Sequence, residues 1–143
     1  MIRQIVPFRR WHMPWLLEQG SAEGTGMPYD VDTLMTLEKQ NSWSAVIDGK
    51  PIACGGTLQH WPGRHQAWTY MTPHTSRHMR FITRAVESAL EKVTGRIELT
   101  VRADFPQGQR WAKMLGFKVE TPCLEDYGPQ GEAHIGYVRF NKG

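Results

Sequence analysis

The chain has 143 residues, of which 40% are hydrophobic and 22% are charged. This length suits one compact domain with a buried core and is too short for two ordinary domains. Its 17 Lys and Arg against 14 Asp and Glu give a formal net charge of +3. That mild excess favours an anionic ligand and disfavours nucleic acid, which usually needs a denser basic surface.

The cysteines and the apolar runs exclude further classes of protein. Cys54 and Cys123 lack the paired spacing of a zinc site and are too few for a disulfide framework. We therefore expect no metal, and we interpret Cys54 as a buried thiol. No run approaches 18 apolar residues, and Pro7 and Pro14 interrupt the basic N-terminal segment. We expect a cytoplasmic protein with no membrane partner.

The N-terminal part predicts a strand over residues 2–8 and a short helix over residues 9–19. Pro14 suits the first turn of that helix, where a missing backbone N–H costs nothing. Trp11 and Trp15 are four residues apart, a spacing that predicts one packing face on the helix.

A loop and a second helix follow. The segment Gly20–Pro28 reads GSAEGTGMP, which predicts a flexible loop that closes over a ligand, with a plain connector as the alternative. Asp30 or Asp32 then caps a helix that runs to about Gln40. Its buried face is predicted to hold Leu34, Met35 and Leu37 or Glu38.

The middle of the chain predicts three strands. Residues 43–47 and 52–60 flank the turn sequence DGKP at Asp48–Pro51, which predicts a β-hairpin. A third strand over residues 65–71 lies beside it. The Gly55–Gly56 pair inside the second strand predicts a bulge or a close approach of another backbone.

The C-terminal part alternates helices and strands. Gly116 stops the second of its helices, and the loop TPCLEDYGPQGEA precedes the last strand. The predicted elements are a helix at 76–93, a strand at 96–101, a helix at 107–115, a strand that begins with FKVE at 117–120, and a strand at 134–140.

This order of elements resembles that of the GNAT (GCN5-related N-acetyltransferase) superfamily. The segment WAKMLGFKVE at 111–120 is similar to the family's helix-to-strand segment "A-x-x-LYEKLGF", and the hairpin around DGKP and the passage through Pro73 match in position. The resemblance implies an α/β fold with a mixed, mostly antiparallel central sheet, splayed parallel strands and flanking helices.

The resemblance also implies acetyl-CoA as the acyl donor. In the family, a loop "Q/R-x-x-G-x-G/A" and the following helix start hold the pyrophosphate. Arg77 matches the basic position, whereas His78 and Arg80 fall where the glycines would be, so their Cβ atoms could block the phosphate. Thr75 or Ser76 can still cap the helix, and two guanidinium groups can bind phosphate. A solvated basic turn is the alternative.

By this resemblance the cofactor lies between the strands that end at Met71 and Val101, and a backbone N–H of the first of these strands polarises the thioester carbonyl. The implied cofactor-binding residues are Tyr70, Met71, Arg77, His78, Met79, Arg80 and Phe81.

The catalytic groups of the family have no direct match. The strand RHQAWTYM carries no Glu, and Ala112 stands where the family frequently has Tyr. An amine must lose its proton before it attacks, and the thiolate needs a proton donor. The substitutes predicted by position are His60, Asp104 and Tyr127, each with an ordinary surface or turn role as the alternative, and Glu23 is a further candidate.

The sequence therefore predicts an acyl-CoA-dependent N-acyltransferase that acts on an amine-bearing small molecule or protein. The alternative is a degenerate GNAT-like protein that binds no CoA and serves as a binding or structural component, of the kind found in bacteriophages and virions; its location is then the host cytoplasm. Trp68 and Tyr70 share one strand face, which suits base stacking, but a core role is favoured. A homodimer is left open.

Overall fold

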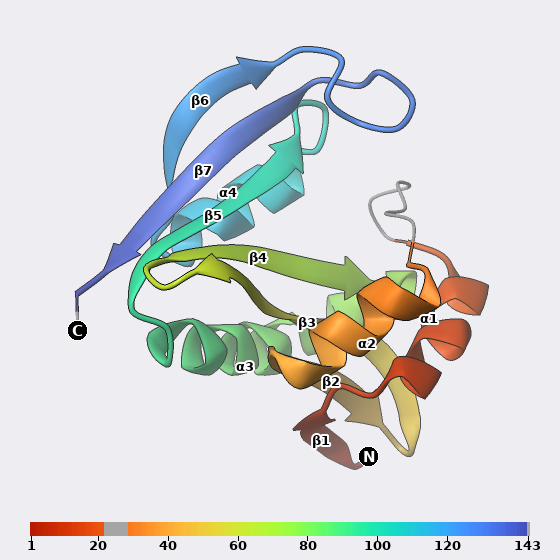
Figure 1. Ribbon diagram of the computed structural model, residues 1–143. Helices are drawn as coiled ribbons and strands as arrows, with labels where there is room; N and C mark the ends of the chain where they lie inside the picture. The colour runs from red at the N-terminus through yellow and green to blue at the C-terminus, as the bar shows by residue number, and fades with distance from the viewer. Residues whose placement is uncertain (22–28, 143) are drawn as a thin grey trace. The chain divides into compact units, whose positions relative to one another are not determined.

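The computed structural model describes residues 1–21 and 29–142 (Figure 1). Glu23 and most of the loop predicted at Gly20–Pro28 lie outside the described residues. None of the helices within the described ranges is long and apolar enough to cross a membrane.

The described residues form a mixed sheet with strand order β1-β2-β3-β4-β5-β7-β6. The pair β4–β5 is parallel, and the pairs β1–β2, β2–β3, β5–β7 and β6–β7 are antiparallel. The strands are β1 Arg3–Pro7, β2 Asn41–Ile47, β3 Lys50–Trp61, β4 Arg64–Met71, β5 Gly95–Arg102, β6 Lys118–Leu124 and β7 His134–Asn141. The helices are η1 Arg10–His12, α1 Met13–Gln19, α2 Val31–Lys39, η2 Pro73–His78, α3 Met79–Glu91 and α4 Pro106–Met114, where η marks a 3₁₀ helix. The predicted α/β class is confirmed.

The chain folds into two compact units. The first unit comprises Met1–Leu58 and Ala67–Lys92, and the second unit comprises Gln59–Gln66 and Val93–Gly143. The long strand β3 and the strand β4 each contribute residues to both units.

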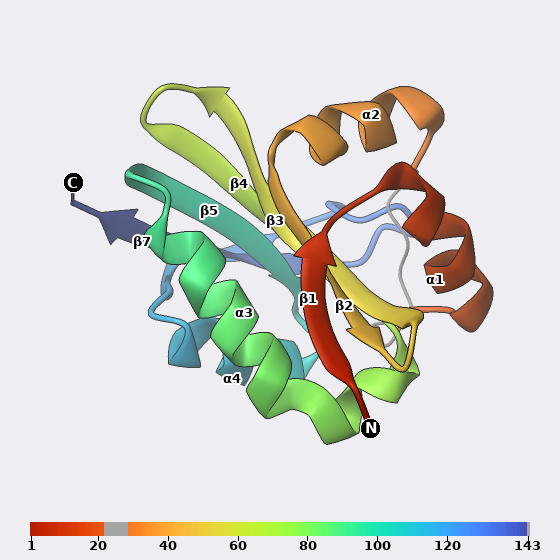
Figure 2. The ribbon, with the colours of Figure 1, turned by 90° about the horizontal axis from the view of Figure 1, so that it is seen from below.

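The core of the first unit lies between the sheet and helices α1 and α2. Figure 2 shows α1 and α2 on one face of β1–β3 and α3 on the other. The rings of Phe8 and Trp68 meet edge to face, with centroids 5.5 Å apart. The core role predicted for Trp68 and Tyr70 is confirmed, since both are buried in this cluster. Its buried members are Phe8, Met13, Leu16, Leu34, Leu37, Cys54, Trp68 and Tyr70.

The packing face predicted for α1 is wrong. Trp11 and Trp15 are 59% and 55% exposed, and Met13 and Leu16 fill the core instead. The α-helix begins only at Met13, because residues 10–12 form a 3₁₀ turn; the spacing from Trp11 to Trp15 therefore does not follow one helical face. On α2, where Asp30 is the predicted cap, Met35 is likewise more exposed than predicted.

The β2–β3 hairpin is confirmed. Its turn is formed by Asp48 and Gly49, whose φ angles of 48° and 84° suit a two-residue hairpin loop. The predicted close approach at the glycine pair is also confirmed, because a Cβ on Gly56 would lie 2.3 Å from the carbonyl oxygen of Asn41. The register shift falls elsewhere, between Ala45 and Val46.

In the second unit, β5 pairs with β7 along its whole length and with β4 through Arg64–Gln66. The strand β6 reaches Leu124, so the residues TPCL of the predicted loop are strand. Helix α4 ends at Met114 and is followed by Gly116 with φ 89°, as the stop signal predicted.

Four charged side chains on strands of the second unit form a network of ion pairs. Glu98 accepts hydrogen bonds from Arg64 Nε at 3.0 Å and from Arg96 Nε at 2.6 Å, and Arg96 also pairs with Glu120. The hydrogen bond from Arg64, followed by that from Arg96, lowers the pKa of Glu98. The ionised carboxylate therefore stabilises the folded state.

Replacing Glu98 by Gln should lower the stability of the protein at pH 7 and matter less in acid. Because the folded pKa of Glu98 is lowered, its contribution is full above the ordinary carboxyl pKa of about 4.3 and is lost as the pH falls through the folded value. Urea unfolding of both proteins between pH 7 and pH 3 measures this difference. Glu125→Gln, at an exposed position of the same unit, is the control, and a pH-independent difference would contradict the prediction.

Candidate functional site

The passage from β4 to α3 differs locally from the prediction. The α-helix begins at Met79 and is preceded by the 3₁₀ helix η2, so the predicted helix start at Ser76 and the cap by Thr75 or Ser76 are wrong. The hydroxyl of Thr75 is buried and donates to the carbonyl of Thr72 at 2.9 Å, so it is engaged before the helix begins. His78 holds the N-cap position of α3 without a side-chain cap bond.

The predicted cofactor-binding residues fall into three groups around this passage. Arg77 and Arg80 are exposed, Met79 and Phe81 are half-buried, and Tyr70, Met71 and His78 are buried. All seven belong to the first unit.

His78 is fixed by the first strand. Its Nδ1 accepts a hydrogen bond from Arg3 Nε at 3.0 Å. A guanidinium can only donate, so the neutral ring carries its proton on Nε2. Burial, followed by the charges of Arg3 and Arg77, lowers the pKa of His78. The side chain at this glycine position is therefore a neutral N–H donor, not a third positive charge.

The start of α3 has the electrostatics of an anion site. Neither η2 nor α3 has an acidic residue in its first turn, and Arg77 and Arg80 add two positive charges to the positive end of the helix dipole. A phosphate placed here would meet charge-assisted donors.

Cys54 and Tyr70 meet inside the first unit. Burial raises the pKa of the Cys54 thiol, and the backbone N–H of Tyr70, which faces the sulfur, offsets this only in part. Cys54 is fully buried, as predicted, and such a thiol is a poor nucleophile.

The three predicted catalytic residues all lie in the second unit. His60 is exposed, and its Nε2 lies 3.1 Å from Gln66 Oε1. Asp104 is held by Arg102 through bonds of 2.9 and 2.7 Å, and the hydrogen bond from Arg102 lowers the pKa of Asp104. Tyr127 is half-exposed.

The structure brings two of these residues toward a histidine that the sequence did not single out. The ring of Tyr127 lies 5.1 Å from that of His134, and His134 is the last of the neighbours, after Arg102, that lower the pKa of Asp104. His134 Nδ1 lies 3.2 Å from the Thr100 hydroxyl. No such contact joins His60 to this group among the interactions of the described residues.

Glu132 completes this group. Its Oε1 lies 3.5 Å from His134 Nε2, and both atoms are buried without a hydrogen-bond partner. Backbone N–H groups, its own first, lower the pKa of Glu132, so the carboxylate faces the ring in its charged form. A carboxylate beside an imidazole can take up and hold a proton. The i, i+2 spacing of Glu132 and His134, the first residue of the last strand, was the available signal.

No protein-family model matches the sequence, and no curated protein matches it. Solved structures match over nearly the whole chain. The ribosomal-protein-S18-alanine N-acetyltransferase from Escherichia coli is 19% identical, with a TM-score of 0.76, over 99% of this chain and 96% of that one. Ard1 from Thermoplasma volcanium is 13% identical, with a TM-score of 0.79, over 100% of both chains. A chain of the NatC complex bound to Gag peptide and CoA is 15% identical, with a TM-score of 0.74, over 96% of this chain and 98% of that one.

Other matching structures carry the name of the GNAT family. The protein therefore has the GNAT fold, and the fold predicted from the order of elements is confirmed.

Proposed function

We propose that the protein is an N-acetyltransferase that moves an acetyl group from acetyl-CoA to an amine. The observation that carries this proposal is the likeness of almost the entire chain to solved acetyltransferases. Because one fold can serve many functions, the proposal also needs residues suited to the reaction.

The first unit offers residues for the acyl donor. Arg77 and Arg80 would hold the pyrophosphate at the start of α3, where the helix dipole and the lack of acidic residues favour anions. The end of β4 at Met71 would align the pantetheine arm. When bound, acetyl-CoA supplies an acetyl thioester. The CoA in the NatC structure supports this choice of donor.

The acceptor is proposed to be the amine of a protein N-terminus. The E. coli protein is named for an alanine of a ribosomal protein, and the NatC structure holds a peptide. An ammonium group must lose a proton before it attacks a carbonyl. Among the described residues of the second unit, Glu132 and His134 have the chemistry of a general base.

The proposal is tested by calorimetric titration with acetyl-CoA, followed by thiol release with a panel of peptides that have free N-terminal amines. Micromolar binding and thiol release with at least one peptide would support it. Blocking the N-terminus of the same peptide by prior acetylation is the control. No binding at millimolar acetyl-CoA would overturn it.

Four predictions from the sequence stay predictions. They are a cytoplasmic location, a possible homodimer, a possible origin in a bacteriophage, and a single GNAT-like domain that includes both units.

A further inference from the structure

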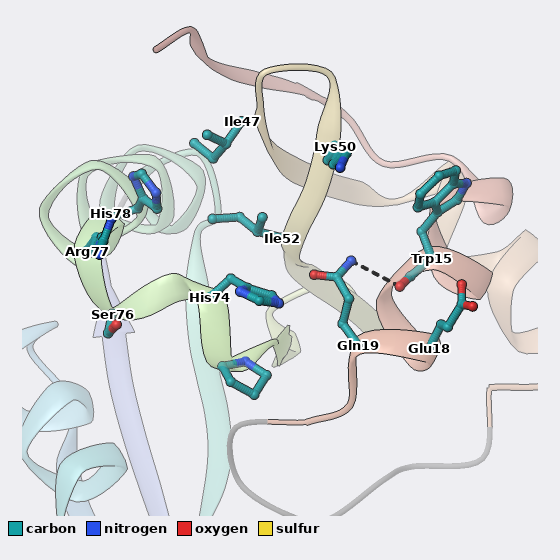
Figure 3. Close-up of a pocket in the computed structure, with 11 residues that line it drawn as sticks. Trp15, Glu18, Gln19, Ile47, Lys50, Ile52, His74, Ser76, Arg77 and His78 are labelled. Atoms are coloured by element: carbon teal, nitrogen blue, oxygen red, sulfur yellow. Dashed lines mark hydrogen bonds between the residues drawn. The ribbon is translucent and has the colours of Figure 1, made fainter.

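The first unit contains a cavity of about 730 Å³, whose lining shares Arg77 with the proposed acetyl-CoA site. Figure 3 shows its walls, which come from the end of α1, the β2–β3 hairpin and the helix η2. Its volume falls in the range of small-molecule sites, which is roughly 300–1,000 Å³.

Two successive carbonyls of β3 hold the walls of this cavity. Gln19 Nε2 on α1 donates to the carbonyl of Pro51 at 3.1 Å and to that of Trp15 at 3.0 Å. On the other side, the hydroxyl and backbone N–H of Thr72 donate to the carbonyl of Ile52 at 2.7 and 3.2 Å. Both walls are therefore held to one strand by hydrogen bonds.

Hydrogen-bond donors predominate on the hairpin and η2 side. Lys50 and Arg77 supply positive charges, and Ser76 supplies a hydroxyl. His78 also lines the cavity, and its Nδ1 is occupied by Arg3. Among the described residues that line the cavity, Glu18 on α1 is the one carboxylate. This arrangement favours a negatively charged group beside Lys50 and Arg77.

An aromatic surface stands on the α1 side of the cavity. Trp15 lines the cavity and is 55% exposed, and Ile47 and Ile52 supply further apolar lining. A half-exposed indole offers a flat face on which a ring can stack.

We propose that this cavity binds a small aromatic anion, in which a ring lies against Trp15 and a phosphate or carboxylate meets Lys50 and Arg77. The proposal does not depend on the acetyltransferase activity. Trp15 and Lys50 lie on α1 and the hairpin, outside the proposed acetyl-CoA site at the start of α3, whereas Arg77 belongs to both sites, so the test replaces Trp15 and Lys50.

The test uses calorimetric titration with phenyl phosphate as the probe, benzoate as its carboxylate counterpart, and phenol and inorganic phosphate as the two halves. The intact protein should bind phenyl phosphate or benzoate more tightly than either half. Lys50→Met and Trp15→Ala should each weaken that binding by about tenfold or more, since each removes a principal contact. Lys39→Met, at an exposed position of α2 away from the cavity lining, should leave it unchanged.

Equal binding of phenyl phosphate by the Lys50 and Lys39 variants would overturn the proposal, as would binding of neither aromatic anion by the intact protein. Titration of the same variants with acetyl-CoA separates the two sites. Unchanged acetyl-CoA binding by Lys50→Met supports a separate site, and parallel loss of both ligands overturns it. If the intact protein binds phenyl phosphate but no acetyl-CoA, the proposed function fails while the cavity proposal stands.

Discussion

Replacing Arg77 and Arg80 together by Ala should weaken acetyl-CoA binding by about 2 kcal/mol or more, which is roughly thirtyfold. Each exposed guanidinium can make a charge-assisted hydrogen bond to phosphate, a contact usually worth about 1.5–3 kcal/mol. The helix dipole at the start of α3 survives the double replacement, so binding should be weakened but not abolished.

Calorimetric titration of the double variant with acetyl-CoA measures this loss. The matched control is Arg84→Ala with Lys92→Ala, which removes the same charge from exposed positions further along α3 and at its C-terminal end. Equal affinities of the two double variants would show that only net charge matters, and the assignment of Arg77 and Arg80 to the phosphates would then be wrong.

Replacing Phe8 by Ala should lower the free energy of unfolding by about 3–5 kcal/mol, the usual cost of deleting a buried aromatic ring. Phe8 is fully buried and meets Trp68 edge to face. Its loss would leave a cavity between the sheet and the helices α1 and α2, which the fixed backbone of β1 and β2 cannot fill.

Denaturant unfolding of the Phe8→Ala and Ile5→Ala variants measures the free energy of unfolding that each substitution costs. Ile5 lies on β1 at 41% exposure, so its truncation removes apolar atoms from the same region without opening a cavity, and should cost much less. Similar losses from both variants would mean that Phe8 is not the anchor of the first unit's core.

Much of the fold could be predicted because local signals and tertiary packing agree in it. The hairpin carries its own turn chemistry at Asp48 and Gly49, and Asp30 precedes α2 as a cap. The close approach at Gly56 could be predicted because a glycine inside a strand often marks a bulge or a place where another backbone comes close. These features depend on residues that are close in sequence, so they can be predicted without knowledge of the whole structure.

The errors arise where the geometry of a short segment differs from the one that its residue pattern indicates. The spacing of Trp11 and Trp15 suited one helix face, but the 3₁₀ turn before Met13 changes which side chains meet the sheet. Thr75 had the chemistry of a cap, but the carbonyl of Thr72 takes its hydroxyl. Glu132 and His134 are only two residues apart, but their pairing, in which Glu132 Oε1 lies 3.5 Å from His134 Nε2, was not predicted. The roles of the predicted catalytic and cofactor-binding residues stay predictions.

The hydrogen bond from Arg3 to His78 spans 75 positions of the chain. The arginine is synthesised long before the histidine, so this contact can form only after β4 and η2 have been made. Contacts of such long range form late and slow folding. The start of α3 therefore receives a hydrogen bond from the strand that the ribosome makes first.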